Sequence, residues 1–323
     1  MDIERSAQSP VTRVLVVGSI NMDLVVTTPV VPQLGQTLAG DGFATHAGGK
    51  GANQAVAAAR LGAQVSLIGR VGRDAFGAQL KAGLVAEGID TRWVLETEGV
   101  PTGIAAITVS QSDNAIIVVG GANLALTPAD LDNADAAFAQ ADVVLVQLEV
   151  PLDTVAHAAR LAGRHGKPLL LNPAPAQPLP EALLAGCALL TPNEHELAVT
   201  LDAETTEPAQ DWRELMARLP GRVAMTRGAD GAYHLGADGA MHHQPGFAVE
   251  PVDTTGAGDT FNGALAAFWP LGMAAAMRLA CAAAALSVTR AGAQSGMPGR
   301  AQLEAFLELS LIHISEPTRR YAI

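Results

Sequence analysis

The segment from Asp253 to Asp259 contains the residue types that transfer of a phosphoryl group requires. It reads Asp-Thr-Thr-Gly-Ala-Gly-Asp and is followed by a helical pattern from Thr260 to Phe268. Small residues ahead of a helix let backbone N–H groups converge on an anion, and the helix dipole favours negative charge there. We expect Asp259 to act as general base for a hydroxyl, with the developing charge held by the N–H groups of Gly256, Ala257 and Gly258. In a simpler interpretation, the glycines shape a turn and Asp259 caps the helix.

A second glycine-rich segment, Gly48–Ala55, could hold a polyhydroxylated ligand. It reads Gly-Gly-Lys-Gly-Ala-Asn-Gln-Ala and opens a helical pattern. The paired glycines Gly48 and Gly49 allow a ligand to approach the backbone closely. Lys50 and Asn53 can donate hydrogen bonds to hydroxyl oxygens. The alternative is the ordinary start of a helix with a solvated lysine.

Polar residues also follow the first apolar run, Val14–Val17. Asn21 and Asp23 are two positions apart, so in extended chain they face the same way. Ligands bind beyond the carboxyl ends of parallel strands, and this pair suits neighbouring sugar hydroxyls. An Asx-turn is the alternative.

Asn193 and Glu196 form a third polar pair, directly after the apolar run Ala188–Leu190. At a spacing of three on a first helical turn, both can face one site. Oxygen ligands at that spacing suit Mg²⁺ held mostly through water, with Glu196 as the nearest carboxylate. A helix-capping arrangement competes with this interpretation, and the two are compatible.

Short apolar runs alternate with helical patterns and position these residues. The alternation predicts an α/β fold, with a central, mostly parallel sheet flanked by helices. Two segments, about 23–43 and 102–121, interrupt it with strand-like character, and the second is predicted to be a hairpin that turns at 112–114. We expect the two segments to pair as a small β-sheet lid. The predicted strands are Val14–Val17, Val65–Ile68, Val143–Leu148, Leu169–Leu171, Ala188–Leu190 and Val223–Thr226, and the predicted helices are Gly51–Leu61, Phe76–Glu87, Leu152–His165 and Trp212–Leu219.

The composition bounds the class of protein. The 323 residues suffice for one large α/β domain with a small appendage, and the net charge of −12 makes nucleic acid a poor partner. Two cysteines, Cys187 and Cys281, lie in apolar stretches, which favours buried thiols in a reducing cytosol. The polar first ten residues do not resemble a secretion signal, and the apolar run Met273–Val288 is short for a membrane span, so we expect a buried helix there.

The end of the chain is expected to differ in origin from the rest. Residues 309–319 resemble an in-frame translation of a transposon-derived sequencing adapter. We therefore expect an N-terminal extension over 1–12, one folded domain that includes the lid segments over 13–308, and a non-native tail over 309–323 in place of the natural end.

From about Val14 to Met297, these motifs resemble the PfkB family of carbohydrate kinases, in its ribokinase branch. The resemblance implies a ribokinase-like fold and a cytoplasmic homodimer joined through the lid. It also implies transfer of a phosphoryl group from ATP to the 5-hydroxyl of D-ribose, with Mg²⁺ and K⁺ as cofactors. The sugar-binding residues that it implies are Asn21, Asp23, Gly48, Gly49, Lys50, Asn53, Glu149 and Asp259.

The resemblance also assigns residues around the nucleotide and a monovalent cation. Cys281 stands where some members carry His near the adenine, and Gly296 stands where the family often has Ser. The implied nucleotide-binding residues are Asn193, Thr226, Arg227, Gly228, Ala229, Asp230, Gly231, Gly258 and Cys281. The implied K⁺ ligands are Asp253, Thr255, Ser287, Arg290, Gly292 and Gly296.

Two alternatives stay open at this point. One is a related specificity on the same frame, for fructose, deoxyribose or a nucleoside. The other is a sugar-binding regulator that kept the fold without catalysis, although such a protein has no need of a base at Asp259.

Overall fold

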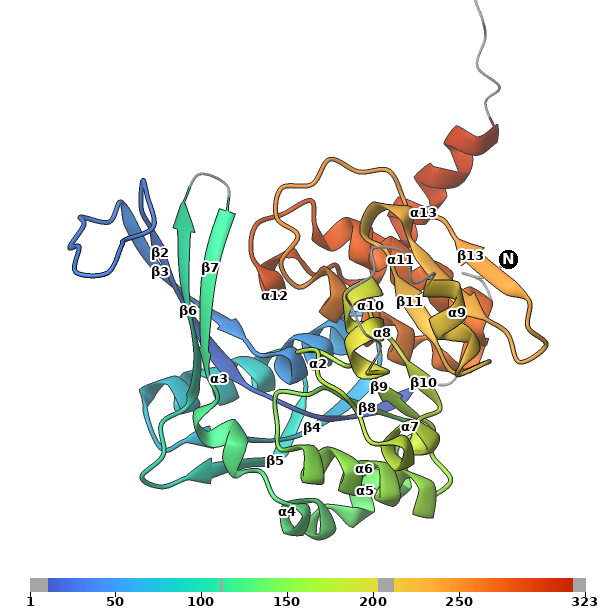
Figure 1. Ribbon diagram of the computed structural model, residues 1–323, viewed down its shortest axis with the longest axis horizontal. Helices are drawn as coiled ribbons and strands as arrows, with labels where there is room; N and C mark the ends of the chain where they lie inside the picture. Colours follow the sequence, from blue (N-terminus) through green and yellow to red (C-terminus); the bar gives the residue numbers. More distant parts are fainter. Residues whose placement is uncertain (1–10, 111–112, 203–211, 316–323) are drawn as a thin grey trace, which may run out of the picture.

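A six-stranded parallel sheet forms the centre of the computed structural model, which describes residues 11–110, 113–202 and 212–315 (Figure 1). Its strand order is β10-β9-β8-β1-β4-β5. The strands are β1 (Arg13–Val17), β4 (Gln64–Gly72), β5 (Asp90–Thr97), β8 (Val143–Val146), β9 (Leu169–Leu171) and β10 (Leu189–Leu190). The predicted parallel sheet is thus confirmed with five of the six predicted strands, since the run Val223–Thr226 belongs to a separate sheet. The sixth strand, β5, is the one that the apolar runs did not reveal.

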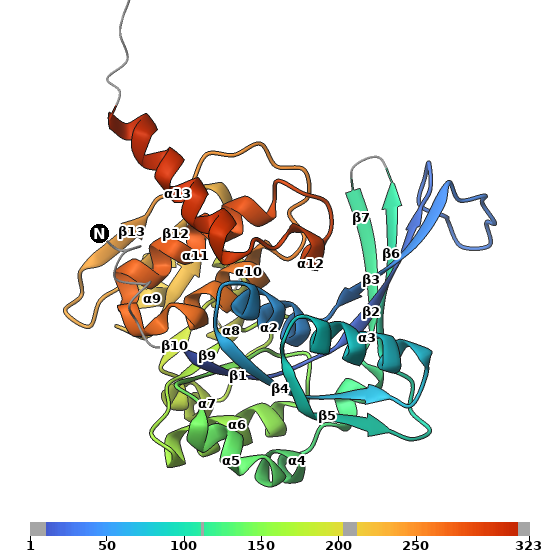
Figure 2. The same ribbon diagram turned by 180° about the vertical axis from the view of Figure 1, so that it is seen from behind.

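Helices cover both faces of this sheet (Figures 1 and 2). The helices are α2 (Lys50–Arg60), α3 (Ala75–Ala86), α4 (Pro128–Asn133), α5 (Asp135–Gln140), α6 (Leu152–Arg164), α7 (Glu181–Gly186), α8 (Glu194–Thr200), α9 (Trp212–Ala217), α10 (Ala257–Ala267), α11 (Met273–Ser287), α12 (Ala293–Gly296) and α13 (Arg300–Ser315). Short 3₁₀ helices span Gly121–Ala125, Gly228–Asp230 and Trp269–Leu271. The four helices predicted from periodicity are confirmed, with ends that shift by one or two residues.

Strand β1 shows why the sheet is buried on both sides. Val14 and Val16 point into a core with α2, α3, α10 and α11, whereas Leu15 and Val17 point into a second core with α4 to α7. All four side chains are almost inaccessible to solvent. The alternation of a strand therefore distributes one apolar run between two cores.

A four-stranded sheet projects from this body as the lid (Figure 1). It has the order β3-β2-β6-β7, with β2 (Asn21–Thr27), β3 (Gly42–Gly48), β6 (Gly103–Ser110) and β7 (Asp113–Val119). Because β2 pairs with β6, the predicted pairing of the two lid segments is confirmed. Of the predicted turn, residue 112 lies outside the described residues. The lid also reaches further than predicted, since Asn21 pairs with Gly48 at its base.

A third, antiparallel sheet joins β11 (Ala224–Thr226), β12 (Ala232–Leu235) and β13 (Met241–Gln244). Single bridges, Leu190 with Val223 and Asn193 with Thr226, place β11 beside the end of β10. The turn after β11, residues 227–231, therefore lies near the carboxyl edge of the central sheet. Strands β12 and β13 were not predicted.

The apolar run from residue 273 forms α11, a buried helix as expected. In the described ranges, the structure has no helix of the length and apolar character that a bilayer crossing requires. Cys187 and Cys281 are both buried and unpaired with each other, which confirms the prediction of free thiols. Residues 309–315 of the suspected tail continue α13, and residues 316–323 and 1–10 lie outside the described part of the chain.

Candidate functional site

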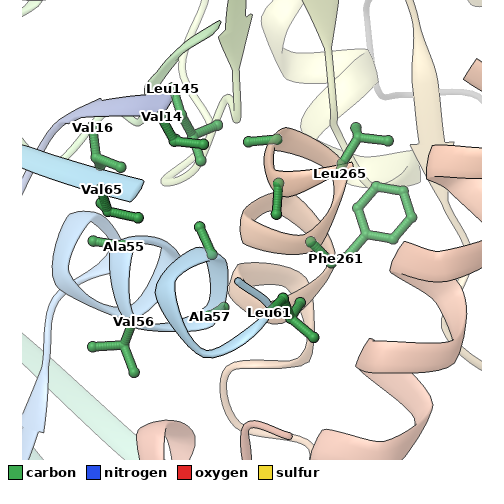
Figure 3. Packing of buried hydrophobic residues seen from close by; sticks show 14 of the residues in the cluster. Val14, Val16, Ala55, Val56, Ala57, Leu61, Val65, Leu145, Phe261 and Leu265 are labelled. Atoms are coloured by element: carbon green, nitrogen blue, oxygen red, sulfur yellow. The ribbon is translucent and has the colours of Figure 1, made fainter. Parts of the chain in front are cut away.

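Two helices, α2 and α10, begin side by side at the carboxyl edge of the central sheet. Figure 3 shows the two helices side by side, and Ala57 of α2 is the side chain that lies against Gly263 of α10. The approach is close because Gly263 has no side chain: a Cβ there would lie 2.5 Å from the Gln54 carbonyl oxygen. Each helix is preceded by a glycine with positive φ, 88° at Gly49 and 77° at Gly256. These glycines turn two chain segments so that both helix N-termini open on one site.

The carboxylate of Asp259 lies between the two helices and is 8% exposed. Its Oδ2 accepts a hydrogen bond from Asn53 Nδ2 at 2.9 Å, and its Oδ1 accepts one from Gln54 Nε2 at 3.0 Å. Asp259 also lines a cavity of about 150 Å³ together with Lys50 and Glu196. The base expected from the sequence is therefore brought to the lysine and asparagine of the Gly48–Ala55 segment.

The residues expected to bind a sugar surround this carboxylate. Glu149 Oε2 accepts hydrogen bonds from Ser19 Oγ at 2.5 Å and from the Lys50 backbone N–H at 3.1 Å. The Asp23 carboxylate lies against Gly48, where a Cβ would come within 2.4 Å of its oxygens. Asn21 Oδ1 accepts a hydrogen bond from Asn123 Nδ2 at 2.7 Å. The base of the lid thus carries acceptors that face the body of the protein.

The charges in this region act strongly on one another. Burial, reinforced by Glu149 and Asp259, raises the pKa of Asp23 from 3.8 to about 6. Burial alone would lower the pKa of Lys50, but Asp259, Glu149 and Glu196 outweigh it and the pKa is raised. Lys50 is therefore the cation that offsets a group of carboxylates, and it stays protonated at neutral pH.

Four amide side chains and a hydroxyl that the sequence analysis did not assign complete the site. Gln54 is within the Gly48–Ala55 segment and Ser19 lies between β1 and Asn21, whereas Asn123 follows the lid and Gln147 follows β8. Gln294 Nε2 donates to Asn53 Oδ1 at 3.0 Å from the distant α12 region. For Asn172 the signal that was available is its position directly after the predicted strand Leu169–Leu171, where ligands of parallel sheets bind. Gln147 lies inside the predicted strand Val143–Leu148, and only the structure shows that β8 ends before it.

Asn172, which directly follows β9, also contacts residues of the site. Its Oδ1 accepts from Gln54 Nε2 at 3.1 Å, and its Nδ2 donates to the Thr191 carbonyl at 3.1 Å. It lines the same cavity as Asp259. The segment that starts at Asn172 thus contributes a side chain to the site itself.

A second, larger cavity of about 530 Å³ adjoins the first. The two share Thr226, Thr254, Ala257 and Gly258, so the glycine loop lies between them. The lining residues are mostly apolar, and they include Phe247, Val249, Phe261, Cys281, Ala284 and Val288. Its size and apolar walls suit a flat heterocycle. Burial raises the pKa of the Cys281 thiol to about 12, so this side chain acts as a small apolar group.

Only some residues of the turn after β11 line the larger cavity. Thr226, Gly228, Ala229 and Gly231 line the larger cavity. The other two side chains form an ion pair, with 2.9 Å between Arg227 Nη1 and Asp230 Oδ2. Arg227 Nε also lies 3.0 Å from Glu194 Oε1. The structure thus brings the backbone of this turn to the cavity and ties its charged side chains together beside it.

Asn193 and Glu196 form the capping arrangement that competed with a metal role. Asn193 Oδ1 accepts from the Glu196 N–H and Glu196 Oε2 accepts from the Asn193 N–H, both at 2.8 Å. Both residues also line the smaller cavity. Burial raises the pKa of Glu196, although the Asn193 N–H and Lys50 oppose this shift.

The residues expected around a monovalent cation lie in two adjacent loops. The carboxylate of Asp253 accepts from the Thr255 N–H at 2.9 Å and from the Gly292 N–H at 2.7 Å. A Cβ on Gly296 would lie 2.4 Å from the Ser287 carbonyl oxygen and 3.4 Å from that of Arg290. Burial opposes ionisation of Asp253, but these donors hold its pKa below the ordinary value. Carbonyl oxygens and a carboxylate thus meet directly behind the glycine loop.

Comparison with known proteins places the chain among enzymes. A family model described as pfkB family carbohydrate kinase matches residues 11–300. A ribokinase of Bacillus subtilis is 43% identical over 297 residues, which cover 91% of this chain and 99% of that protein. A deoxyribokinase of Salmonella typhi is 37% identical and covers 92% and 99%, respectively. Among solved structures, an Arabidopsis thaliana ribokinase complexed with ribose and ATP superposes with a TM-score of 0.85 at 32% identity, covering 93% of this chain and 99% of that chain.

Proposed function

The chain belongs to the pfkB family of carbohydrate kinases, and we propose that it transfers the γ-phosphoryl group of ATP to the 5-hydroxyl of D-ribose. The observation that carries this proposal is the position of Asp259, held by the Asn53 and Gln54 amides at the mouth of α10. The names of the relatives support the substrates, since the Bacillus subtilis and Arabidopsis thaliana proteins are ribokinases and the latter was solved with ribose and ATP.

In the proposed reaction, Asp259 accepts the proton of the 5-hydroxyl as its oxygen bonds to the γ-phosphorus. The bond from that phosphorus to the oxygen bridging it to the β-phosphate breaks, and ADP leaves with the electron pair. The N–H groups at residues 256–258 are placed to stabilise the transferring group at the helix N-terminus. Lys50 balances the carboxylates that orient the sugar.

For the nucleotide, we propose that the adenine occupies the larger cavity and the phosphates extend over the glycine loop into the smaller one. Glu196 is the carboxylate proposed to hold Mg²⁺ through water. Within the described ranges, no three His, Cys, Asp or Glu side chains converge as a metal site, so phosphate oxygens and water would supply most ligands. Magnesium would neutralise charge on the phosphates during transfer.

We also propose that K⁺ binds between the loops that contain Asp253 and Gly292. The support is the donor set itself, a carboxylate with the carbonyl oxygens of Ser287 and Arg290 close to Gly296. Such hard oxygen donors suit an alkali cation. A cation there would fix the loop directly behind Gly256, which packs against Ala293.

The remaining proposals concern the assembly and its compartment. Exposed apolar side chains lie on the lid, including Phe43, Ile117 and Val118 at 68%, 69% and 52% exposure. We propose that two lids pair in a homodimer that covers these side chains. We further propose a cytoplasmic location, which the two unpaired thiols and the need for ATP support.

The variant Asp259→Asn tests the proposed chemistry. Removing the base lowers kcat by about 10²- to 10⁴-fold, while ribose binding measured by calorimetry is largely retained. Turnover equal to that of the unaltered protein would refute Asp259 as the base.

Deoxyribose is the second candidate sugar, because the Salmonella typhi relative is a deoxyribokinase of similar length. Comparing kcat/KM across ribose, deoxyribose, fructose and nucleosides distinguishes them. A regulator would instead show a ribose-dependent rise in melting temperature with no ADP formed when ATP and Mg²⁺ are present.

A further inference from the structure

A buried amide, Gln54, joins Asp259 to the ends of two strands. Its side chain has no solvent exposure. Gln54 Nε2 donates to Asp259 Oδ1 at 3.0 Å and to Asn172 Oδ1 at 3.1 Å, and its Oε1 accepts from Gln147 Nε2 at 2.6 Å. Building on the function proposed above, we propose that Gln54 is a positioning residue that fixes the orientation of the Asp259 carboxylate for proton acceptance.

The neighbours of Gln54 leave its carboxamide one orientation. Asn172 uses its own Nδ2 to donate to the Thr191 carbonyl, so its Oδ1 faces Gln54 as an acceptor. A flipped Gln54 would place an oxygen against two acceptor oxygens and its NH₂ against the donor of Gln147. Both N–H groups and the oxygen of Gln54 are therefore used only in the observed orientation.

Space for this arrangement is provided by a glycine. Gly18 follows β1, and a Cβ at that position would lie 2.1 Å from Gln147 Oε1. Gln147 can thus reach Gln54 because residue 18 has no side chain. The contact of Gln147 with Gln54 therefore depends on a glycine at position 18, at the edge of the sheet.

The effect on the base follows from where the donors bind. Asn53 donates to one oxygen of Asp259 and Gln54 donates to the other. Rotation of the carboxylate would break both hydrogen bonds, so its plane is fixed. A carboxylate has about four lone-pair sites, and the two donors leave the others for a sugar hydroxyl.

The same network reaches the glycine loop. From Asn172 it continues through the Thr191 carbonyl, and Thr191 Oγ1 donates to Asn262 Oδ1 at 2.5 Å. Asn262 Nδ2 then donates to the Gly258 carbonyl at 2.8 Å. Gln54 therefore connects the base with the peptide that precedes it, which keeps the proton acceptor aligned with the proposed phosphate cradle.

The variant Gln54→Met tests this proposal, because methionine has similar length but neither donors nor a strong acceptor. We expect kcat to fall roughly 10- to 100-fold, as for a slightly misplaced reacting group. The KM values for ribose and ATP should change by no more than about threefold, since neither substrate contact is removed. A control is Thr154→Val in α6, which removes one buried hydrogen bond, to the Leu126 carbonyl, and none of the hydrogen bonds of Gln54 or Asp259. It should lower the melting temperature and leave kcat unchanged.

The variant Gln54→Glu gives a readout that a purely structural role would not change. At high pH its carboxylate repels Asp259, whereas at lower pH a shared proton restores a donor toward Oδ1. The ratio of its kcat to that of the unaltered protein should therefore rise as pH falls, and the ratio for Gln54→Met should not. Asp23, Lys50, Glu149 and Glu196 also face this region, and taking the ratio at each pH removes their common effect.

Three outcomes would overturn the proposal: Gln54→Met with unchanged kcat, a loss confined to KM, or a flat ratio for Gln54→Glu. If Gln54→Met does not fold, Gln147→Met removes the donor to Gln54 Oε1 instead, and unchanged kcat there would count against the proposal. An unaltered protein that does not phosphorylate ribose would refute the proposed function alone, and the Gln54 variants are then assayed with whichever sugar of the panel is turned over.

Discussion

At the residue scale, the site concentrates negative charge where a neutral sugar would bind. Asp23, Glu149 and Asp259 lie close enough that the last two help to raise the pKa of Asp23 to about 6. Lys50 offsets only part of this charge. These carboxylates are therefore held in a conformation that is electrostatically unfavourable at neutral pH, which is common where binding groups are fixed in advance.

The variant Asp23→Asn should consequently stabilise the protein without ligand. A carboxyl whose folded-state pKa is raised favours the folded state below pH 4 and loses that contribution as pH rises through 6. At pH 8 the substitution removes a cost of about 1–3 kcal/mol, the lower figure allowing for solvent screening. We expect a higher melting temperature at pH 8, a much smaller difference at pH 4, and weaker ribose binding at both. An equal gain at both pH values would contradict this explanation.

The reactive residues could be predicted from sequence more readily than their supports. Asp259, Lys50 and Asn53 stand out because glycines flank them. Gln294 bonds to Asn53 from 241 positions away, and no local pattern marks a glutamine in a short helix as part of a site. Arg227 was assigned to the nucleotide because of its place in a family motif. Its side chain instead forms ion pairs with Glu194 and Asp230 and does not line the larger cavity.

At the scale of elements, the contact between α2 and α10 determines the distance from Asn53 and Gln54 to Asp259. The helices approach so closely at Gly263 that a Cβ would also lie 2.6 Å from Ala57 Cβ. The crossing is therefore tighter than a helix pair with ordinary side chains allows.

We expect Gly263→Ala to push the helices apart and cost about 1–3 kcal/mol of stability through overpacking. Because the shift also lengthens the hydrogen bonds to Asp259, kcat should fall together with the melting temperature. A matched control is Gly83→Ala in α3, where nothing lies within 4 Å of the new Cβ. That control should be neutral or stabilise by up to about 1 kcal/mol. Similar results for both variants would show that the close crossing is unimportant.

Strands could be predicted from the sequence where both faces of the sheet are buried. The runs that became β1, β8 and β9 are apolar throughout, so composition alone marks them. Strand β5 carries Asp90, Arg92 and Glu96, and it is only partly buried. Strand β13 contains two adjacent exposed histidines and no buried residue. Pairing across the sheet stabilises such strands, and a local pattern does not reveal it.

At the scale of the whole molecule, the lid leaves an apolar surface that a second copy of the chain is proposed to cover. The variant Ile117→Asp places a charge on that surface without touching the buried cores. Light scattering should report a dimer for the unaltered protein and a monomer for the variant, since a buried unpaired charge costs several kcal/mol. A control is Val85→Asp, on an exposed position of α3 in the body. A monomeric unaltered protein would refute pairing through the lid.

The long separations between bonded partners have a consequence for biosynthesis. Asn53 meets Asp259 across 206 positions and Gln294 across 241. On the ribosome, the residues proposed to hold the sugar emerge early, but the carboxylate proposed to accept the hydroxyl proton emerges 206 residues after Asn53. A nascent chain therefore has no complete site until the segments that carry Asp259 and Gln294 have been synthesised.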